Sequence, residues 1–163
     1  MQNRRDFLKT AARAGAAVAL PGCAMGSRPR GHVVVVGGGY GGATAAKYLR
    51  MWSQKGVDVT LVERNPQFIS CPISNLVIGG DKQMADITMS YAGLRDTWGV
   101  KVVQDSVIAV DAAARKLRLA SGGELGYDRL VLSPGVDFMF EQLPGLESEA
   151  SRSRALHAWK AGA

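Results

Sequence analysis

The chain has 163 residues, of which 47% are hydrophobic and 21% are charged, a composition typical of an ordinary globular domain. Its formal net charge is +6, but residues 1–30 hold six basic residues and one acidic residue, so the remainder carries a net charge of only +1. The nearly neutral remainder has no basic stripe that would predict nucleic-acid binding, and no segment after residue 30 is long and apolar enough to span a bilayer.

The first thirty residues are predicted to be an export signal. Arg4 and Arg5 begin the pattern Arg-Arg-Asp-Phe-Leu-Lys, and a modestly apolar stretch follows over residues 11–20. The segment resembles a twin-arginine signal, which would deliver the folded protein to the periplasm; a basic amphipathic helix is the alternative. Cys23 also fits the position of a lipidated cysteine, but Pro21 is unusual there, and we expect ordinary cleavage nearby.

The strongest motif joins four consecutive valines, residues 33–36, to an Ala-rich helical segment. Between them lies the pattern Gly37-x-Gly39-x-x-Gly42, with a further glycine at Gly41. In a dinucleotide-binding turn, the first glycine permits the tight turn, the second lets the backbone approach a pyrophosphate, and the third packs the helix on the strand. We therefore expect these glycines to bind a dinucleotide; a Gly-rich loop without a ligand is the alternative.

A second predicted strand, residues 57–63, ends in an acid. Glu63 follows Gly42 by 21 residues, which is where the dinucleotide fingerprint places an acceptor for ribose hydroxyls. The alternative for Glu63 is a solvated charge at the end of a strand. Arg64 next to it either borders the adenine or is an exposed turn residue.

The next forty residues depart from a plain dinucleotide-binding unit. Residues 64–81 form a long connection that contains Cys71, and loops of this length are usually functional. Residues 85–99 carry apolar side chains at a spacing of three to four, which predicts an amphipathic helix that ends at Gly99.

The remainder of the chain is predicted to be mainly β. Ser133, Pro134 and Gly135 follow its last strand, and they either bring backbone close to a cofactor or simply end the strand. The predicted strands cover residues 100–103, 106–110, 116–120, 124–127 and 129–132, with a hairpin turn at 121–123. This order predicts an α/β fold: a Rossmann-like FAD-binding domain with an antiparallel meander inserted into a parallel sheet, belonging to an incomplete two-dinucleotide-domain reductase.

Several segments together resemble a narrower family, the flavoprotein subunit of flavocytochrome c sulfide dehydrogenase, within the group that holds the sulfide:quinone reductases. The resemblance covers residues 31–163. It is carried by VVVVGGGYGGATAAKYLR (33–50), VTLVERN (59–65), CPISNLVIGGD (71–81), GYDRLVLSPGVDF (126–138) and LHAWKAG (156–162).

The resemblance implies FAD as the cofactor and a role for Cys71. Members of the family attach FAD through a thioether to the 8α-methyl group of the isoalloxazine, and Cys71 falls at that position. The residue types leave the alternative of a packed, unreactive thiol open. The two histidines, His32 and His157, lie apart from any Cys, Asp or Glu cluster, so no metal site is expected.

By the same resemblance, the intact protein passes electrons from sulfide through FAD to a c-type cytochrome subunit. The redox-active cysteine pair of the family belongs to a part that this sequence does not include, so we expect no catalytic residue here and an inactive or partial fragment, truncated before the second dinucleotide-type domain. The alternatives are a sulfide:quinone or NADH:acceptor reductase of the same superfamily, and a non-catalytic exported flavin-binding remnant.

Overall fold

A computed structural model of the chain describes residues 30–155. The predicted export signal, with Arg4, Arg5 and Cys23, lies outside these residues, and so does the LHAWKAG segment.

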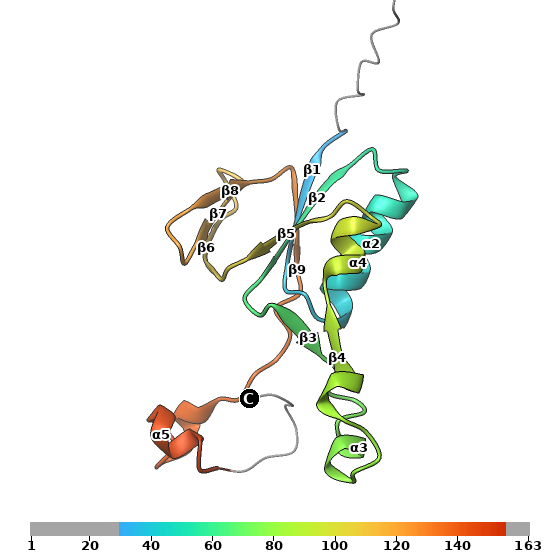
Figure 1. The fold of residues 1–163 in the computed structure, drawn as a ribbon. Helices are drawn as coiled ribbons and strands as arrows, with labels where there is room; N and C mark the ends of the chain where they lie inside the picture. The colour runs from blue at the N-terminus through green and yellow to red at the C-terminus, as the bar shows by residue number, and fades with distance from the viewer. Residues whose placement is uncertain (1–29, 156–163) are drawn as a thin grey trace, which may run out of the picture.

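The centre of the fold is a four-stranded parallel sheet with the strand order β5-β2-β1-β9 (Figure 1). Its strands are β1 (His32–Val36), β2 (Asp58–Glu63), β5 (Lys101–Gln104) and β9 (Arg129–Leu132). Val33, Val34 and Val35 of β1 are buried because this strand lies inside the sheet and both sheet faces are covered, which explains its apolar run. The parallel sheet predicted from the sequence is thereby confirmed.

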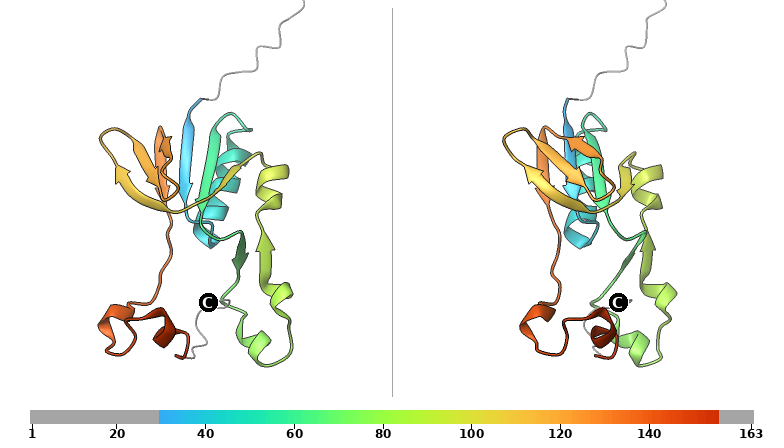
Figure 2. Two further views of the ribbon diagram at one scale, coloured as in Figure 1. Left: turned by 60° about the vertical axis from the view of Figure 1, so that its left-hand side comes forward. Right: turned by 90° about the vertical axis from the view of Figure 1, so that its left-hand side faces the viewer.

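The two faces of the sheet are covered by different structures. Helices α2 (Tyr40–Trp52) and α4 (Ala92–Asp96) lie on one face, and the antiparallel meander lies on the other (Figure 2). The meander consists of β6 (Val107–Asp111), β7 (Lys116–Leu119) and β8 (Glu124–Gly126). Strand β7 alternates exposed and buried residues, and its Leu117 and Leu119 pack against Val34 and Val62 of the sheet. The predicted hairpin and meander are confirmed.

The region between β2 and β5 differs from the sequence prediction. The prediction of a single helix over residues 85–99 was wrong. The structure has three elements in this region: the 3-10 helix η2 (Met84–Ile87), strand β4 (Thr88–Ser90) and the short helix α4. The connection 64–81 is also structured in part, since it contains β3 (Gln67–Ile69) and helix α3 (Asn75–Ile78). Antiparallel pairing of β3 with β4 outweighs the local helical pattern.

Beyond β9 the chain forms two short helical turns, the 3-10 helix η3 (Phe140–Gln142) and α5 (Glu149–Arg152). Both lie past the carboxyl ends of the parallel strands, as does the segment with β3, β4 and α3 (Figures 1 and 2).

A buried arginine at the end of α2 joins the helix to the sheet. The guanidinium of Arg50 donates hydrogen bonds to the backbone C=O groups of Trp98 at 2.9 Å and Val57 at 2.5 Å. It also donates to the Lys55 C=O at 3.1 Å and forms an ion pair with Asp58 at 3.4 Å. One side chain therefore connects α2, the start of β2 and the turn before β5.

Substitution of this arginine is expected to destabilise the domain. Arg50→Leu leaves the partly buried carbonyl groups of Val57 and Trp98 without this donor. Each such loss costs about 1–3 kcal/mol, so we expect the free energy of unfolding to fall by about 2 kcal/mol. Urea denaturation measures the free energy of unfolding of each variant. Arg95→Leu is the control, because the Arg95 side chain is 62% exposed and pairs with its neighbour Asp96. Equal losses in the two variants would contradict the assignment.

Candidate cofactor-binding site

The carboxyl ends of three parallel strands meet at one edge of the sheet. The Gly-rich turn follows β1, Glu63 ends β2, and Ser133 follows β9. Because Val36 is in register with both Val62 and Leu132, these three strand ends lie side by side. In open α/β sheets this edge is where ligands bind.

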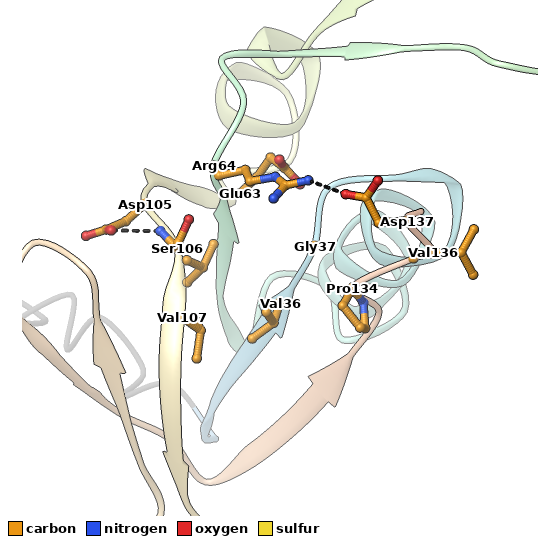
Figure 3. A pocket seen from close by; sticks show the side chains of 12 residues that line it. Val36, Gly37, Glu63, Arg64, Asp105, Ser106, Val107, Pro134, Val136 and Asp137 are labelled. Atoms are coloured by element: carbon orange, nitrogen blue, oxygen red, sulfur yellow. Dashed lines mark hydrogen bonds and ion pairs between the residues drawn. The ribbon is translucent and has the colours of Figure 1, made fainter. Parts of the chain in front are cut away.

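A cavity of about 360 Å³ opens at this edge (Figure 3). Of the residues predicted from the sequence, it brings together Gly37, Glu63, Arg64 and Gly135. The other predicted residues do not line it: Gly39, Gly41, Gly42, Cys71 and Ser133. Its other lining residues are Val36, Val62, Asp105, Ser106, Val107, Pro134, Val136 and Asp137. The convergence of segments far apart in the sequence makes this cavity the candidate site.

Two glycines of the turn are required by the backbone itself. Gly37 has φ +95°, and a Cβ atom there would overlap the C=O group of Ser133. A Cβ atom on Gly42 would overlap the C=O group of Gly37. The strand, the turn and the helix therefore pack so closely that no side chain fits at either position.

Gly39 is different, because the protein itself leaves space for a side chain there. Its φ of −68° suits any residue, and within residues 30–155 only Phe68 Cε2 comes within 4 Å of a Cβ atom there, at 4.0 Å. The space beside Gly39 is thus available to something outside the protein. Gly41 is exposed, and a Cβ atom there would lie 2.8 Å from the hydroxyl oxygen of Ser133.

The carboxylate of Glu63 holds the turn in place. Its Oε2 accepts a hydrogen bond from the Gly38 N–H at 2.6 Å, and its Oε1 accepts one from the Asn65 N–H at 2.8 Å. A carboxylate has about four lone-pair sites, so both oxygens can accept further hydrogen bonds. The half-buried Glu63 therefore orders the Gly-rich turn and keeps acceptor capacity for a ligand.

An ion pair joins two strand ends beside the cavity. The guanidinium of Arg64, after β2, lies 3.3 Å from the carboxylate of Asp137, after β9 (Figure 3). Both side chains are largely exposed, so the pair contributes at most about 1 kcal/mol to stability. The position of this ion pair is more informative than its strength, because the pair joins the segment that contains Gly135 to the end of β2.

Sequence reasoning missed Asp105 and Ser106, which line the cavity from the β5–β6 connection. Hydrogen bonds from the Ser121 side chain and from the Ser106 N–H, the latter at 2.7 Å, lower the pKa of Asp105. The Asp105 N–H also donates to the Glu63 C=O at 3.1 Å. The available signal was their place directly after a parallel strand, where ligand-binding residues gather.

Cys71 lies after β3, in the segment that projects past the carboxyl ends of the parallel sheet (Figure 1). Its side chain is half-buried. Its C=O group accepts hydrogen bonds from the Ser74 N–H at 2.9 Å and the Ser74 hydroxyl at 2.8 Å. The structure thus fixes the backbone at Cys71 but does not bring this residue to the main cavity.

A smaller cavity of about 170 Å³ lies on the other side of the Gly-rich turn. Its wall is formed largely by Phe68, Met89, Tyr91 and Leu94, and Gly39 lines it as well.

Within residues 30–155, no group of three His, Cys, Asp or Glu side chains is arranged to hold a metal ion. None of the helices in that part of the chain has the length and apolar character needed to cross a membrane.

Two family models match the sequence. The model of the pyridine nucleotide-disulphide oxidoreductases matches residues 31–161. The model of the twin-arginine translocation pathway signal sequence matches residues 1–21, which identifies this segment as a signal for twin-arginine export to the periplasm.

Similar curated proteins include several with sulfide in their names. The flavoprotein chain of sulfide dehydrogenase [flavocytochrome c] from Chlorobaculum thiosulfatiphilum is 58% identical over 46 residues, which cover 28% of this chain and 94% of that sequence. The sulfide-quinone reductase of Aquifex aeolicus (strain VF5) is 29% identical over 127 residues, which cover 78% of this chain and 29% of the relative. This chain therefore spans less than a third of that reductase.

Solved structures of this architecture superpose on the chain. The sulfide:quinone oxidoreductase of Aquifex aeolicus matches with a TM-score of 0.62 and 29% identity, covering 67% of this chain and 25% of that one. An NAD-dependent persulfide reductase from A. fulgidus matches with a TM-score of 0.62 and 23% identity, covering 72% and 24%, and shows likeness of fold alone.

Proposed function

This chain belongs to the pyridine nucleotide-disulphide oxidoreductase family, and from that membership we propose that it forms the FAD-binding part of a periplasmic flavoprotein that oxidises sulfide. The proposed electron acceptor is a c-type cytochrome subunit. The proposal of substrate and acceptor is supported by the 58% identity to the flavoprotein chain of sulfide dehydrogenase [flavocytochrome c]. The match to a twin-arginine signal fits this assignment, because that route exports proteins already folded around a cofactor.

One structural observation carries the proposal of a dinucleotide: Gly37 of the Gly-rich turn, Glu63 and Gly135 converge on one cavity. The backbone excludes side chains at Gly37 and Gly42 for its own packing, while the space beside Gly39 is left open. We assign the pyrophosphate to the N-terminus of α2, where helix N–H groups lack partners within the helix.

Other residues of the site fit the remaining parts of FAD. Glu63 would accept hydrogen bonds from the hydroxyl groups of the adenosine ribose, and an acid at this position disfavours a 2′-phosphate. The backbone at Ser133 and Gly135 would border the cofactor from β9, and Arg64 would border the adenine. Bound FAD would supply the redox chemistry, and these residues would hold and orient it.

The experiment is a comparison of FAD with NADH on the purified chain. Binding is followed by quenching of flavin fluorescence and of NADH fluorescence, and retention by gel filtration. We expect FAD to stay with the protein and NADH to separate from it. Tight NADH binding together with no retention of FAD would reject the assignment.

A second function, sulfide:quinone reduction, is supported by the Aquifex aeolicus relative and its solved structure. The acceptor distinguishes the two. With sulfide as the donor, protein isolated from the periplasm is expected to reduce a c-type cytochrome; reduction of a short-chain quinone instead would favour the second function. Bound flavin without any sulfide-dependent reduction would indicate a non-catalytic flavin-binding protein.

Export is expected to depend on the arginine pair. Replacing both Arg4 and Arg5 with lysine keeps the charge but removes the planar guanidinium groups, for which an ammonium is not an equivalent donor. We expect the doubly substituted protein to stay in the cytoplasm, as measured by fractionation and immunoblotting. Arg28→Lys, outside the matched residues 1–21, is the control. Undiminished delivery of the double variant to the periplasm would refute the twin-arginine route.

A further inference from the structure

We propose that Tyr91 is a positioning residue, which holds the Gly-rich turn in the conformation that receives the dinucleotide. The inference rests on the proposed function for its ligand, but its geometry is independent of that function. Tyr91 lies between β4 and α4, more than fifty residues after the turn, and no dinucleotide motif includes it.

Both polar groups of Gly38 are held by side chains. The Tyr91 hydroxyl donates a hydrogen bond to the Gly38 C=O at 3.1 Å. The Gly38 N–H donates to Glu63 at 2.6 Å. The two bonds involve the peptide units on either side of the Gly38 Cα atom, so together they restrict both of its dihedral angles.

The orientation of the next N–H group follows from the planarity of the peptide. In a trans peptide the C=O and N–H point in opposite directions. Because the Gly38 C=O points to Tyr91, the Gly39 N–H points away from Tyr91. Tyr91 therefore sets the direction of a donor at the position where the backbone leaves space for a ligand.

Tyr91 is itself firmly placed. It is 8% exposed and belongs to the apolar cluster formed by Val33, Val35 and Ala46 under the sheet. Gly38 packs so closely on it that a Cβ atom would overlap the phenol. Burial and, secondarily, the charge of Glu63 raise the pKa of Tyr91 to about 12, so the hydroxyl keeps its proton and remains a donor at physiological pH.

The expected benefit is preorganisation. A run of glycines has much conformational freedom, and a ligand that orders it loses binding free energy. A turn already fixed by Tyr91 and Glu63 avoids that loss. Tyr91→Phe keeps the ring in the cluster and removes only the hydrogen bond to Gly38, so it isolates the positioning effect.

The test compares Tyr91→Phe with a matched control, Thr60→Val. Thr60 is 3% exposed, and its hydroxyl hydrogen-bonds to His32 Nε2 at 2.8 Å, near the strand ends opposite the site. Each variant loses one hydroxyl hydrogen bond, so we expect similar small losses of unfolding free energy. We expect the Kd for FAD to rise about tenfold in Tyr91→Phe, the order of one hydrogen bond, and to stay unchanged in Thr60→Val.

Amide hydrogen exchange in the ligand-free chain provides the second readout. The Gly38 N–H should exchange faster in Tyr91→Phe than in the unmodified chain, and at the unmodified rate in Thr60→Val. Unchanged exchange at Gly38 in Tyr91→Phe overturns the inference, whatever ligand the protein binds. If Tyr91→Phe loosens the turn but the unmodified chain fails to bind FAD, the positioning role stands and the proposed function fails. If FAD binds equally well to the unmodified chain and to Tyr91→Phe, the positioning role of Tyr91 is wrong and the proposed function is unaffected.

Discussion

Gly39→Val is expected to abolish retention of FAD while the domain stays folded. In the described part of the chain, only Phe68 comes within 4 Å of a Cβ atom at Gly39, at 4.0 Å, and the φ of −68° is accessible to valine. A valine there therefore costs the fold little, but it occupies the space that we assign to the pyrophosphate. We expect FAD binding to weaken by at least about 100-fold, or about 2.7 kcal/mol, as measured by flavin fluorescence.

Two other glycines provide controls of opposite kind. Gly42→Val should unfold the domain, because its Cβ atom would overlap the backbone of Gly37. Gly93→Val in α4 should leave the FAD affinity unchanged and should not lower the unfolding midpoint, because no heavy atom of the described residues lies within 4 Å of a Cβ atom there and valine is a better helix former than glycine. If Gly39→Val retained FAD like the unmodified chain, the assignment of the pyrophosphate to this turn would be wrong.

The parallel sheet and the turn were predictable because their signals are local. An interior strand of a sheet that is covered on both faces is apolar along its length, so the four valines of residues 33–36 predict such a strand. Ser-Gly-Gly at residues 121–123 supplies the φ of +92° at Gly122 that the hairpin between β7 and β8 uses. Each of these features depends on residues that are neighbours in the sequence.

The segment from η2 to α4 was not predictable in this way. Ile87, Tyr91 and Leu94 have a helical spacing, and all three do contribute to the apolar interior. They reach it from a 3-10 turn, a bend and a short helix, because β4 pairs with β3, which lies about twenty residues earlier. Burial was read correctly from the pattern, whereas the backbone conformation depended on a partner strand that the local pattern does not show.

The residues of the candidate site also fall into two groups, those predictable from a local motif and those placed by contacts between distant segments. Gly37 and Glu63 follow from a motif with fixed spacing, and the structure brings them to one cavity. Asp105 reaches the same cavity only because β5 pairs with β2, and Tyr91 reaches Gly38 only through the packing of the region before α4. The position of Asp105 directly after a strand was the one available signal for it, and the contact of Tyr91 with Gly38 had none.

Cys71 lies between β3 and α3, and its predicted role is a covalent link to FAD. The resemblance assigns it to a thioether with FAD, but it lies in the β3–α3 segment, apart from the cavity that contains Glu63. A link to Cys71 therefore requires FAD to extend from that cavity past the Gly-rich turn toward this segment. FAD is an elongated dinucleotide, so its adenosine and its isoalloxazine can be held by different parts of the domain.

Acid precipitation tests the link in the exported protein. If Cys71 forms the thioether, denaturation cannot release the flavin, and the yellow colour should remain in the pellet. In Cys71→Ser, which keeps a small polar side chain but lacks a thiolate nucleophile, the flavin should move entirely to the supernatant. Cys23→Ser, which removes the other cysteine of the chain, should behave like the unmodified protein. Flavin released equally from the unmodified protein and Cys71→Ser would show that Cys71 is a packed, unreactive thiol, and that FAD is held by the Gly-rich turn and Glu63 through noncovalent contacts alone.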